Sequence, residues 1–358
     1  MRIPATCIAA ASLLGLAGAA LADSRVPIED MTGKTVSVPA EPKRIVSIPV
    51  VMPPMLYAVD GTGERIVGMH PVTKTAVQNS VLARMAPELL AVPTGFIKGG
   101  FKVNIEELLK LKPDLVFQIS PEKREIEKME AVGLPVLATD SGDFYDYYTG
   151  YLRILGEVLG KKERADQIRA EFDATLAAIK AKTKGIKPED RPKGLILFNA
   201  ERRMATGSGS FANYWLGNTG ATNVAAEIKT SPRGATVSME QILRWNPDII
   251  YITNFSTNVP EDLYENRIEG QDWSAVRAVK EKRVYKIPLG QYRWYPPSAD
   301  SALMLKWMAA TNHPSLFADV DIRAEIKDHF KRIYAFDLTG EDIDRILKPD
   351  PTSDWKWN

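Results

Sequence analysis

Apolar runs alternate with amphipathic patterns along most of the chain, and this alternation predicts an α/β protein. Strand candidates are residues 44–49, 65–70, 114–120 and 135–140 in the first half and 194–199, 221–225, 248–254 and 283–288 in the second. The unbroken apolar runs "LVF" and "IIYI" are typical of parallel strands that are covered on both faces. Helical patterns separate the strands, which predicts parallel sheets.

A repeated segment indicates that the chain folds into two lobes. "NIEELLKLKPDLVFQI" starts at Asn104, and "SMEQILRWNPDIIYIT" starts at Ser238, 134 positions later. The two copies keep the pairs Glu106/Glu240, Leu109/Leu243, Pro113/Pro247 and Asp114/Asp248. Each copy predicts a short amphipathic helix, a proline that ends it, and a buried strand. Duplication of one lobe is the simplest account of this repeat.

The segment between the lobes has helical periodicity. Apolar residues recur every three or four positions from Leu152 to Leu159 and again from Ile168 to Ile179, without proline from Asp143 to Lys184. This predicts one long amphipathic helix, or two with a break near Gly160. A helix of about 40 residues would span roughly 60 Å. We therefore expect an N-terminal α/β lobe over 23–141, a connecting backbone helix over 142–185 and a C-terminal α/β lobe over 186–358. The fold class is thus two Rossmann-like lobes with parallel sheets, joined by a long rigid helix, with a ligand cleft between them.

The first residues predict export. Arg2 precedes an apolar run that ends in Ala20-Leu21-Ala22, which is typical of a secretory signal peptide over 1–22 cleaved near Ala22-Asp23. The run is too short for a membrane span. Cys7 is the single cysteine and lies well before the cleavage site, so we expect no lipoprotein anchor. The mature chain then has no disulfide and no thiolate site, which fits a bacterial periplasm.

The charge balance narrows the classes of partner. The chain has 46 Lys and Arg against 45 Asp and Glu, and loss of Arg2 with the signal peptide leaves 45 of each. Nucleic-acid binding needs a clear basic excess, which is absent. Three scattered histidines also argue against a site for bare zinc or manganese, so we expect no protein ligand to contact a metal directly.

The repeat, the lobes and the connecting helix resemble the periplasmic binding proteins of ABC importers for iron–siderophore complexes, haem and cobalamin. "NIEELLKLKPDLV" and "SMEQILRWNPDII" are similar to that family's paired motif, and "DMTGKTVSVPAEPKRIVSI" to its entry into the first strand. The resemblance implies a monomeric receptor, peripheral to the membrane and without a cofactor. It also implies that Glu106 and Glu240 bind arginines of an ABC permease dimer, which works with a cytoplasmic ATPase. The alternative is that both glutamates merely stabilise helix N-termini.

Open parallel sheets bind ligands beyond the carboxyl ends of their strands. The segments in that position are 49–54, 70–71, 120–121, 140–141, 200–210, 254–255 and 289–297, with the loop 231–237 as a further candidate. Arg202, Arg203 and Arg233 lie in these segments, and guanidinium groups bind carboxylates, catecholates and oxyanions. His70 ends a strand and is either a ligand contact or a structural histidine.

The stretch "YRWY" at Tyr292–Tyr295 is the remaining candidate. If it is extended, Tyr292 and Trp294 share one face, and Arg293 and Tyr295 share the other. One pair then packs against the core while the other contacts ligand, and Pro296-Pro297 fixes the backbone. The alternative is that all four attach the last strand to the helix that follows.

The function that these patterns favour is capture of a metal chelate, with a ferric siderophore as the expected cargo. Haem, cobalamin or an oxyanion such as molybdate or tungstate remain open. An exported enzyme is the alternative of a different class. No Gly-x-Ser-x-Gly elbow, zinc-hydrolase histidine motif or phosphate loop occurs, which argues against it.

Overall fold

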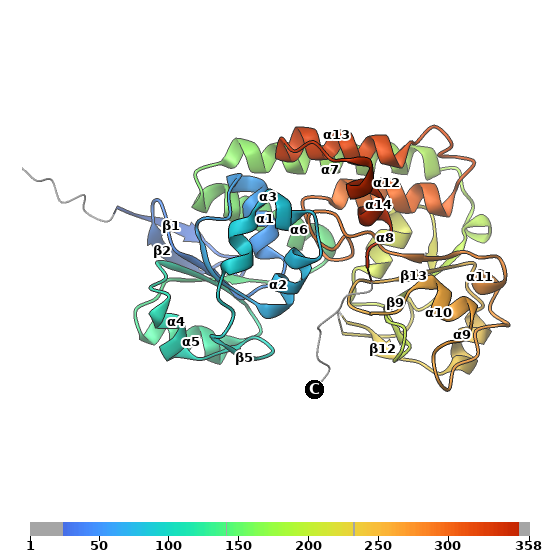
Figure 1. Cartoon of the computed structure of the whole chain (residues 1–358), viewed down its shortest axis with the longest axis horizontal. Helices are drawn as coiled ribbons and strands as arrows, with labels where there is room; N and C mark the ends of the chain where they lie inside the picture. Colours follow the sequence, from blue (N-terminus) through green and yellow to red (C-terminus); the bar gives the residue numbers. More distant parts are fainter. Residues whose placement is uncertain (1–23, 141, 232, 351–358) are drawn as a thin grey trace, which may run out of the picture.

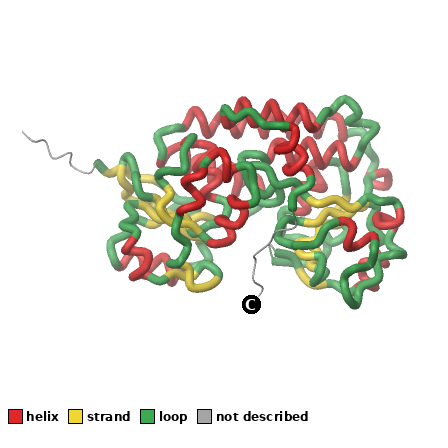
Figure 2. The backbone as a smooth tube through the Cα atoms, viewed as in Figure 1, coloured by secondary structure: helices red, strands yellow, loops and turns green. Residues whose placement is uncertain are grey.

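The computed structural model describes residues 24–140, 142–231 and 233–350. The predicted signal peptide therefore lies outside the described residues. Two lobes lie side by side under a layer of helices (Figure 1). Figure 2 shows that the strands are confined to the two lobes. Within the described ranges, no helix has the length and apolar character needed to cross a membrane.

The first lobe is built on a four-stranded sheet of order β4-β3-β7-β8, in which all neighbours are parallel. Its strands are β3 (Ile45–Ser47), β4 (Ile66–Met69), β7 (Leu115–Ile119) and β8 (Val136–Thr139). Two antiparallel pairs accompany it: β1 (Arg25–Glu29) with β2 (Thr35–Pro39), and β5 (Ile97–Gly99) with β6 (Lys102–Val103). Its helices are α1 (Met52–Asp60), α2 (Pro71–Gln78), α3 (Leu82–Met85), α4 (Ile105–Lys110), α5 (Lys123–Ala131) and the 3-10 helix η1 (Pro87–Ala91).

The second lobe is built on a sheet of order β12-β10-β9-β13-β14, with β11 also paired to β9. The strands are β9 (Lys193–Asn199), β10 (Met204–Ala205), β11 (Thr222–Asn223), β12 (Ala235–Thr236), β13 (Ile249–Ile252) and β14 (Val284–Lys286). β9, β11, β13 and β14 are parallel neighbours, whereas β10 and β12 add an antiparallel edge. The helices are α8 (Ala212–Asn218), α9 (Met239–Trp245), α10 (Pro260–Tyr264), α11 (Arg277–Lys280) and the 3-10 helix η2 (Pro188–Asp190), followed by α12 (Ser301–Asn312), α13 (Ile322–Tyr334) and α14 (Gly340–Leu347). All eight predicted strands are present.

The connection between the lobes is two helices rather than one. α6 (Phe144–Val158) and α7 (Lys162–Thr183) are separated by Gly160, whose φ of 63° ends α6 in a left-handed turn. The expectation of a single helix of about 40 residues is therefore wrong, and the alternative with a break near Gly160 is correct. α6 packs on α7 and on α1, and α7 also packs on α12. Figure 1 shows α7 and α13 along the side of the molecule that bridges both lobes.

The repeated segments have the same structure in each lobe. Asp114 accepts hydrogen bonds from the backbone N–H groups of Lys43 and Arg44, at 2.7 and 2.9 Å, at the start of β3. Asp248 accepts one from the backbone N–H of Lys193, at 2.8 Å, at the start of β9. Each aspartate thus ties its own strand to the neighbouring parallel strand. The recurrence of this aspartate in both copies of the repeat therefore has a structural cause.

Candidate functional site

A cavity of about 380 Å³ lies between the two lobes. Its lining residues come from both lobes and include no acidic side chain; they are Val50, Val51, Phe101, Ile119, Pro121, Tyr147, Phe198, Phe211, Ser231, Arg233, Phe255, Tyr295 and Pro296. Two larger hollows are each lined from one part of the molecule: a groove of about 560 Å³ by α6 and α7 alone, and a hollow of about 610 Å³ by the first lobe alone. The interlobe cavity is therefore the candidate binding site.

The cavity lies at the carboxyl ends of the parallel strands. Ile119 ends β7, Phe198 is the penultimate residue of β9, and Phe255 follows β13 by three positions. Five segments that the sequence singled out reach the cavity: 49–54, 120–121, 254–255, 231–237 and 289–297. This is the position in which open parallel sheets bind ligands.

Two helix N-termini reach the cavity, one from each lobe. Val50 and Val51 directly precede α1, and their backbone N–H groups make no hydrogen bond within the described part of the chain. Pro53 and Pro54 follow at the start of the helix and have no N–H to offer. Phe211 is the N-cap of α8 in the second lobe. Helix N-termini carry partial positive charge and exposed donors, which favour an anion.

Tyr295 lines the cavity, and its hydroxyl is buried near Thr206 and Ser210 of the second lobe. This hydroxyl has no hydrogen-bond partner among the described residues. The nearby hydroxyls of Ser210 and Thr206 already donate to the carbonyls of Gly207 and Ile196, at 2.7 and 2.9 Å. Burial is the main influence on the pKa of Tyr295 and raises it to about 12, while the neighbouring polar groups of Ser210, Thr206, Ala212 and Phe211 oppose the rise without meeting hydrogen-bond geometry. Tyr295 therefore remains a neutral donor at physiological pH.

The backbone of Tyr295 is held by the second lobe. The Trp215 indole N–H on α8 donates to the carbonyl oxygen of Tyr295 at 2.8 Å. Trp215 also packs edge-on against Phe144 of α6, with ring centroids 4.4 Å apart. An aromatic cluster therefore links the helices between the lobes to the wall of the cavity.

The segment 289–300 folds back on itself instead of running extended. Leu289 and Arg293 form an antiparallel bridge, and the backbone N–H of Gly290 donates to the carbonyl of Tyr292 at 3.1 Å. A Cβ at Gly290 would lie 2.6 Å from the indole nitrogen of Trp294, so only glycine fits there. The alternation of two faces was expected only for an extended stretch, and it does not apply to this folded one.

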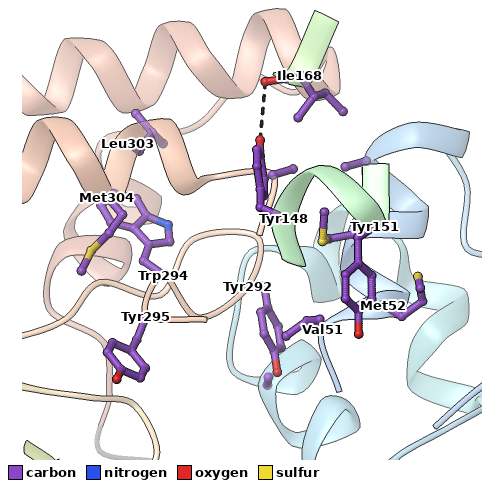
Figure 3. Close-up of a cluster of buried hydrophobic side chains, with 14 of the residues drawn as sticks. Val51, Met52, Tyr148, Tyr151, Ile168, Tyr292, Trp294, Tyr295, Leu303 and Met304 are labelled. Atoms are coloured by element: carbon purple, nitrogen blue, oxygen red, sulfur yellow. Dashed lines mark hydrogen bonds between the residues drawn. The ribbon is translucent and has the colours of Figure 1, made fainter. Parts of the chain in front are cut away.

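The side chains of Tyr292–Tyr295 point to different surroundings, and each is at most 2% exposed. Figure 3 shows Tyr292 beside Val51 and Trp294 beside Met304, with the Tyr295 ring directed away from both. Of the four, only Tyr295 lines the cavity.

The same segment joins the lobes. The Gln291 amide donates to the carbonyl of Pro54 on α1, and the backbone N–H of Val81 donates to the carbonyl of Gly290. Arg293 donates to the carbonyl of Val72 on α2 at 3.2 Å. These bonds connect the loop of the second lobe to three helical regions of the first.

Arg293 is a buried cation beside the cavity wall. Its guanidinium carbon lies 4.7 Å from the centroid of Phe255, a lining residue, and it donates to the Tyr292 hydroxyl at 3.3 Å. It forms no ion pair with a carboxylate among the described residues, so its positive charge is uncompensated by a neighbouring acid. That charge adds to the positive potential of the cavity.

A buried polar network connects segment 289–300 to α7 and α13. Asp300 accepts hydrogen bonds from the Trp294 indole at 3.0 Å and from the Tyr334 hydroxyl at 2.6 Å. His329 lies 3.4 Å from Asp300 and 2.9 Å from Glu171 on α7. Burial would lower the pKa of His329, but the two carboxylates outweigh burial and raise it. The network thus ties α7 and α13 to the segment that carries Tyr295.

The four remaining candidate ligand residues occupy different positions. Arg233 lines the cavity at an exposed position, and partial burial lowers the pKa of its guanidinium. Arg202 is exposed, and Arg203 donates to the Val237 carbonyl at 3.0 Å; neither lines the cavity. His70 caps α2 by accepting from the Val72 N–H, and its other ring nitrogen bonds to the Gly100 carbonyl at 2.8 Å. Ligand contact by these four residues stays a prediction.

Glu106 and Glu240 are exposed on α4 and α9, and neither makes a hydrogen bond or ion pair among the described residues. Figure 1 places both helices at the side of the lobes opposite α7 and α13. Their positions match the predicted docking role, which stays a prediction. In the same described ranges, no group of three or more His, Cys, Asp or Glu residues could hold a metal ion.

Nothing in the sequence marked several of the lining residues as ligand contacts. Phe101, Tyr147 and Phe211 come from connections or from α6, where aromatic residues predict core as readily as a binding site. Tyr147 is bonded to the hydroxyl of Tyr151 at 2.8 Å, which its spacing of four on one helix allows.

The comparisons with known proteins agree that this chain is similar to solute-binding proteins. The family model described as periplasmic binding protein matches residues 55–289. A solved periplasmic solute binding protein from Veillonella parvula is 35% identical with a TM-score of 0.83, covering 91% of this chain and 97% of that chain. The molybdate-binding protein MolA of Haemophilus influenzae is 29% identical, covering 90% of this chain and 94% of the relative. A structure of MolA bound to molybdate has a TM-score of 0.75 at 25% identity, covering 88% and 99% of the two chains. The ferric-anguibactin-binding protein of Vibrio anguillarum is 26% identical over 42% of this chain and 47% of the relative.

Proposed function

This chain belongs to the periplasmic binding proteins of ABC importers, and on that premise we propose that its interlobe cavity captures a compact oxyanion of the molybdate class. The observation that carries the proposal is a set of donors without acceptors at one cavity. Among the residues that the structure describes, the N–H groups of Val50 and Val51 and the hydroxyl of Tyr295 have no hydrogen-bond partner, and they come from opposite lobes. An oxyanion has enough acceptor oxygens to satisfy all three.

The charge around the cavity supports an anion. The N-terminus of α1, Arg233 and the buried Arg293 all contribute positive potential. The lining includes no carboxylate that would oppose it. A neutral or cationic ligand would leave this potential without a counter-charge.

The size of the cavity supports a compact ligand. At about 380 Å³ it lies near the lower end of the range for small-molecule sites, which is roughly 300–1,000 Å³. Macrocycles such as haem and cobalamin need more enclosed volume. The similarity to MolA, which extends over most of both chains, supports the same ligand class.

A small anionic ferric siderophore is the second candidate, because the cavity walls are rich in aromatic rings. Phe198 and Phe255 stack with centroids 4.7 Å apart and planes 9° apart, and Phe101 and Phe211 also line the cavity. Flat aromatic surfaces suit the rings of a catecholate or phenolate chelator. The similarity to the ferric-anguibactin-binding protein fits this alternative, although it covers less of the chain.

Delivery to a permease completes the proposed function. Glu106 and Glu240 would bind arginines of the permease, one for each lobe, so that their separation reports the arrangement of the lobes. Export by a signal peptide over 1–22, without a lipid anchor, stays a prediction that mass spectrometry of the mature protein would test.

Isothermal titration calorimetry tests the ligand class. Molybdate and tungstate should each bind at one site per chain. Sulfate, phosphate, ferric anguibactin, a ferric hydroxamate and haem are titrated separately as alternative ligands. Binding of a ferric siderophore with no binding of molybdate would replace the first candidate with the second. Binding of haem alone would contradict both.

A further inference from the structure

Two exposed leucines occupy matched positions in the two lobes. Leu109 on α4 and Leu243 on α9 are each 40% exposed, and they are 134 positions apart, as the repeat requires. The other large hydrophobic residues exposed to this extent are Leu90, Val132 and Leu316, at 38%, 44% and 40%. All three lie outside the repeated segments 104–119 and 238–253. Duplication has therefore kept an exposed apolar side chain on both lobes.

Each leucine lies one helical turn after an exposed glutamate. Glu106 precedes Leu109 by three residues, and Glu240 precedes Leu243 by three, which places each pair on one helix face. The nearest basic side chains are bonded elsewhere: Lys110 pairs with Glu107 at 2.6 Å, and Arg244 donates to Gln241 at 2.7 Å. Both glutamates are thus available to an external cation, with an apolar side chain beside each.

The two helices that carry these pairs lie on the same side of the molecule (Figure 1). Figure 1 shows α4 and α9 at the edges of their lobes, away from the bridging helices α7 and α13. A partner that contacts both pairs needs two copies of one complementary site, each with a cation beside an apolar pocket. A two-fold symmetric protein dimer offers that arrangement.

We propose that Leu109 and Leu243 are the apolar anchors of the docking surface for the permease dimer, each inserted into a pocket beside the arginine that binds Glu106 or Glu240. This inference rests on the proposed function, because it takes the permease as the partner. The glutamates accelerate encounter and set orientation through charge. The leucines, once buried, slow dissociation, because desolvated apolar contacts hold an interface together.

The test compares two double variants that differ only in location. Leu109→Gln with Leu243→Gln removes the proposed anchors, and Leu90→Gln with Leu316→Gln removes two leucines of similar exposure elsewhere. Glutamine keeps helix propensity close to that of leucine. Thermal unfolding and molybdate titration of both variants check folding and ligand binding. The single variants Leu109→Gln and Leu243→Gln extend the test if the double variant unfolds early.

The partner is the permease and ATPase pair that restores molybdate uptake when it is expressed with this chain. Surface plasmon resonance then measures binding of each variant to that pair, which is reconstituted in nanodiscs. Loss of both anchors should raise the dissociation rate on the order of a hundredfold, and loss of one roughly tenfold, at nearly unchanged association rate. The Leu90/Leu316 variant should dissociate like the wild type, and Glu106→Gln with Glu240→Gln should mainly lower the association rate at low salt.

Equal dissociation rates for the wild type and the Leu109/Leu243 variant would overturn the proposed anchors and leave the proposed function intact. Failure of the wild-type chain to bind molybdate or to support uptake with any permease would instead contradict the proposed function. The two failures are therefore separate observations.

Discussion

Replacement of Tyr295 by phenylalanine should raise stability and lower ligand affinity at the same time. The Tyr295 hydroxyl is buried without a hydrogen-bond partner, and an unpaired buried hydroxyl costs about 1–3 kcal/mol. Its removal should raise the free energy of unfolding of the ligand-free protein by about 1 kcal/mol, which corresponds to roughly 1–2 °C in Tm for a chain of this size. If the hydroxyl donates to a bound anion, the lost bond is worth about 1.5–3 kcal/mol, or about 10–100-fold in Kd.

Tyr147→Phe is the matched control. Tyr147 lines the same cavity, but its hydroxyl is bonded to Tyr151 at 2.8 Å, and Tyr151 donates to Thr139 at 3.1 Å. Loss of a satisfied bond should lower the free energy of unfolding by about 1 kcal/mol. Urea denaturation and calorimetric titration with molybdate give both quantities for both variants. The reasoning is refuted if Tyr295→Phe loses stability as Tyr147→Phe does and keeps the wild-type Kd.

Three further perturbations test other parts of the account. Phe144→Ala should lower the free energy of unfolding by about 3–5 kcal/mol in urea denaturation, because this ring is 2% exposed and packs against α7 and α8. Burial would raise the pKa of Glu171, but bonds to His329 and a neighbouring arginine outweigh burial and lower it to about 2. Its stabilising effect is therefore present above pH 4.5 and lost as the pH falls toward 2, so the wild type should lose stability over this window more steeply than Glu171→Gln. Arg293→Met should weaken binding of a monoanion about 30-fold and of a dianion more, because Coulomb's law gives about 2 kcal/mol for an assumed charge separation of about 8 Å at an effective dielectric constant of about 20. Equal losses for neutral and anionic ligands in calorimetry would contradict this.

The sequence was sufficient for the scaffold because periodicity and proline placement act locally. The repeat around Asp114 and Asp248 predicted strands β7 and β13, and the structure shows why both aspartates recur: each bonds the start of a neighbouring strand. Gly160 marked the break between α6 and α7, because its positive φ ends the first of these helices.

The candidate site was predictable by segment but not by side chain. Four of the segments that follow strands and the loop 231–237 reach the cavity, yet within 289–300 the bridge between Leu289 and Arg293 turns the chain back on itself. Which of Tyr292 to Tyr295 then faces the cavity depends on the bond that Trp294 donates to Asp300 and on the bond from Trp215, which is 80 positions from Tyr295 in sequence. The unbonded N–H groups of Val50 and Val51 depend equally on tertiary structure.

The most direct test of the central claim is anomalous diffraction from crystals of the mature protein grown with molybdate. The proposed site predicts one strong molybdenum peak per chain in the interlobe cavity, with the oxyanion within hydrogen-bond distance of the Val51 backbone nitrogen and the Tyr295 hydroxyl. A cavity without molybdenum, or a peak confined to another part of the surface, would contradict the claim that this site captures the oxyanion.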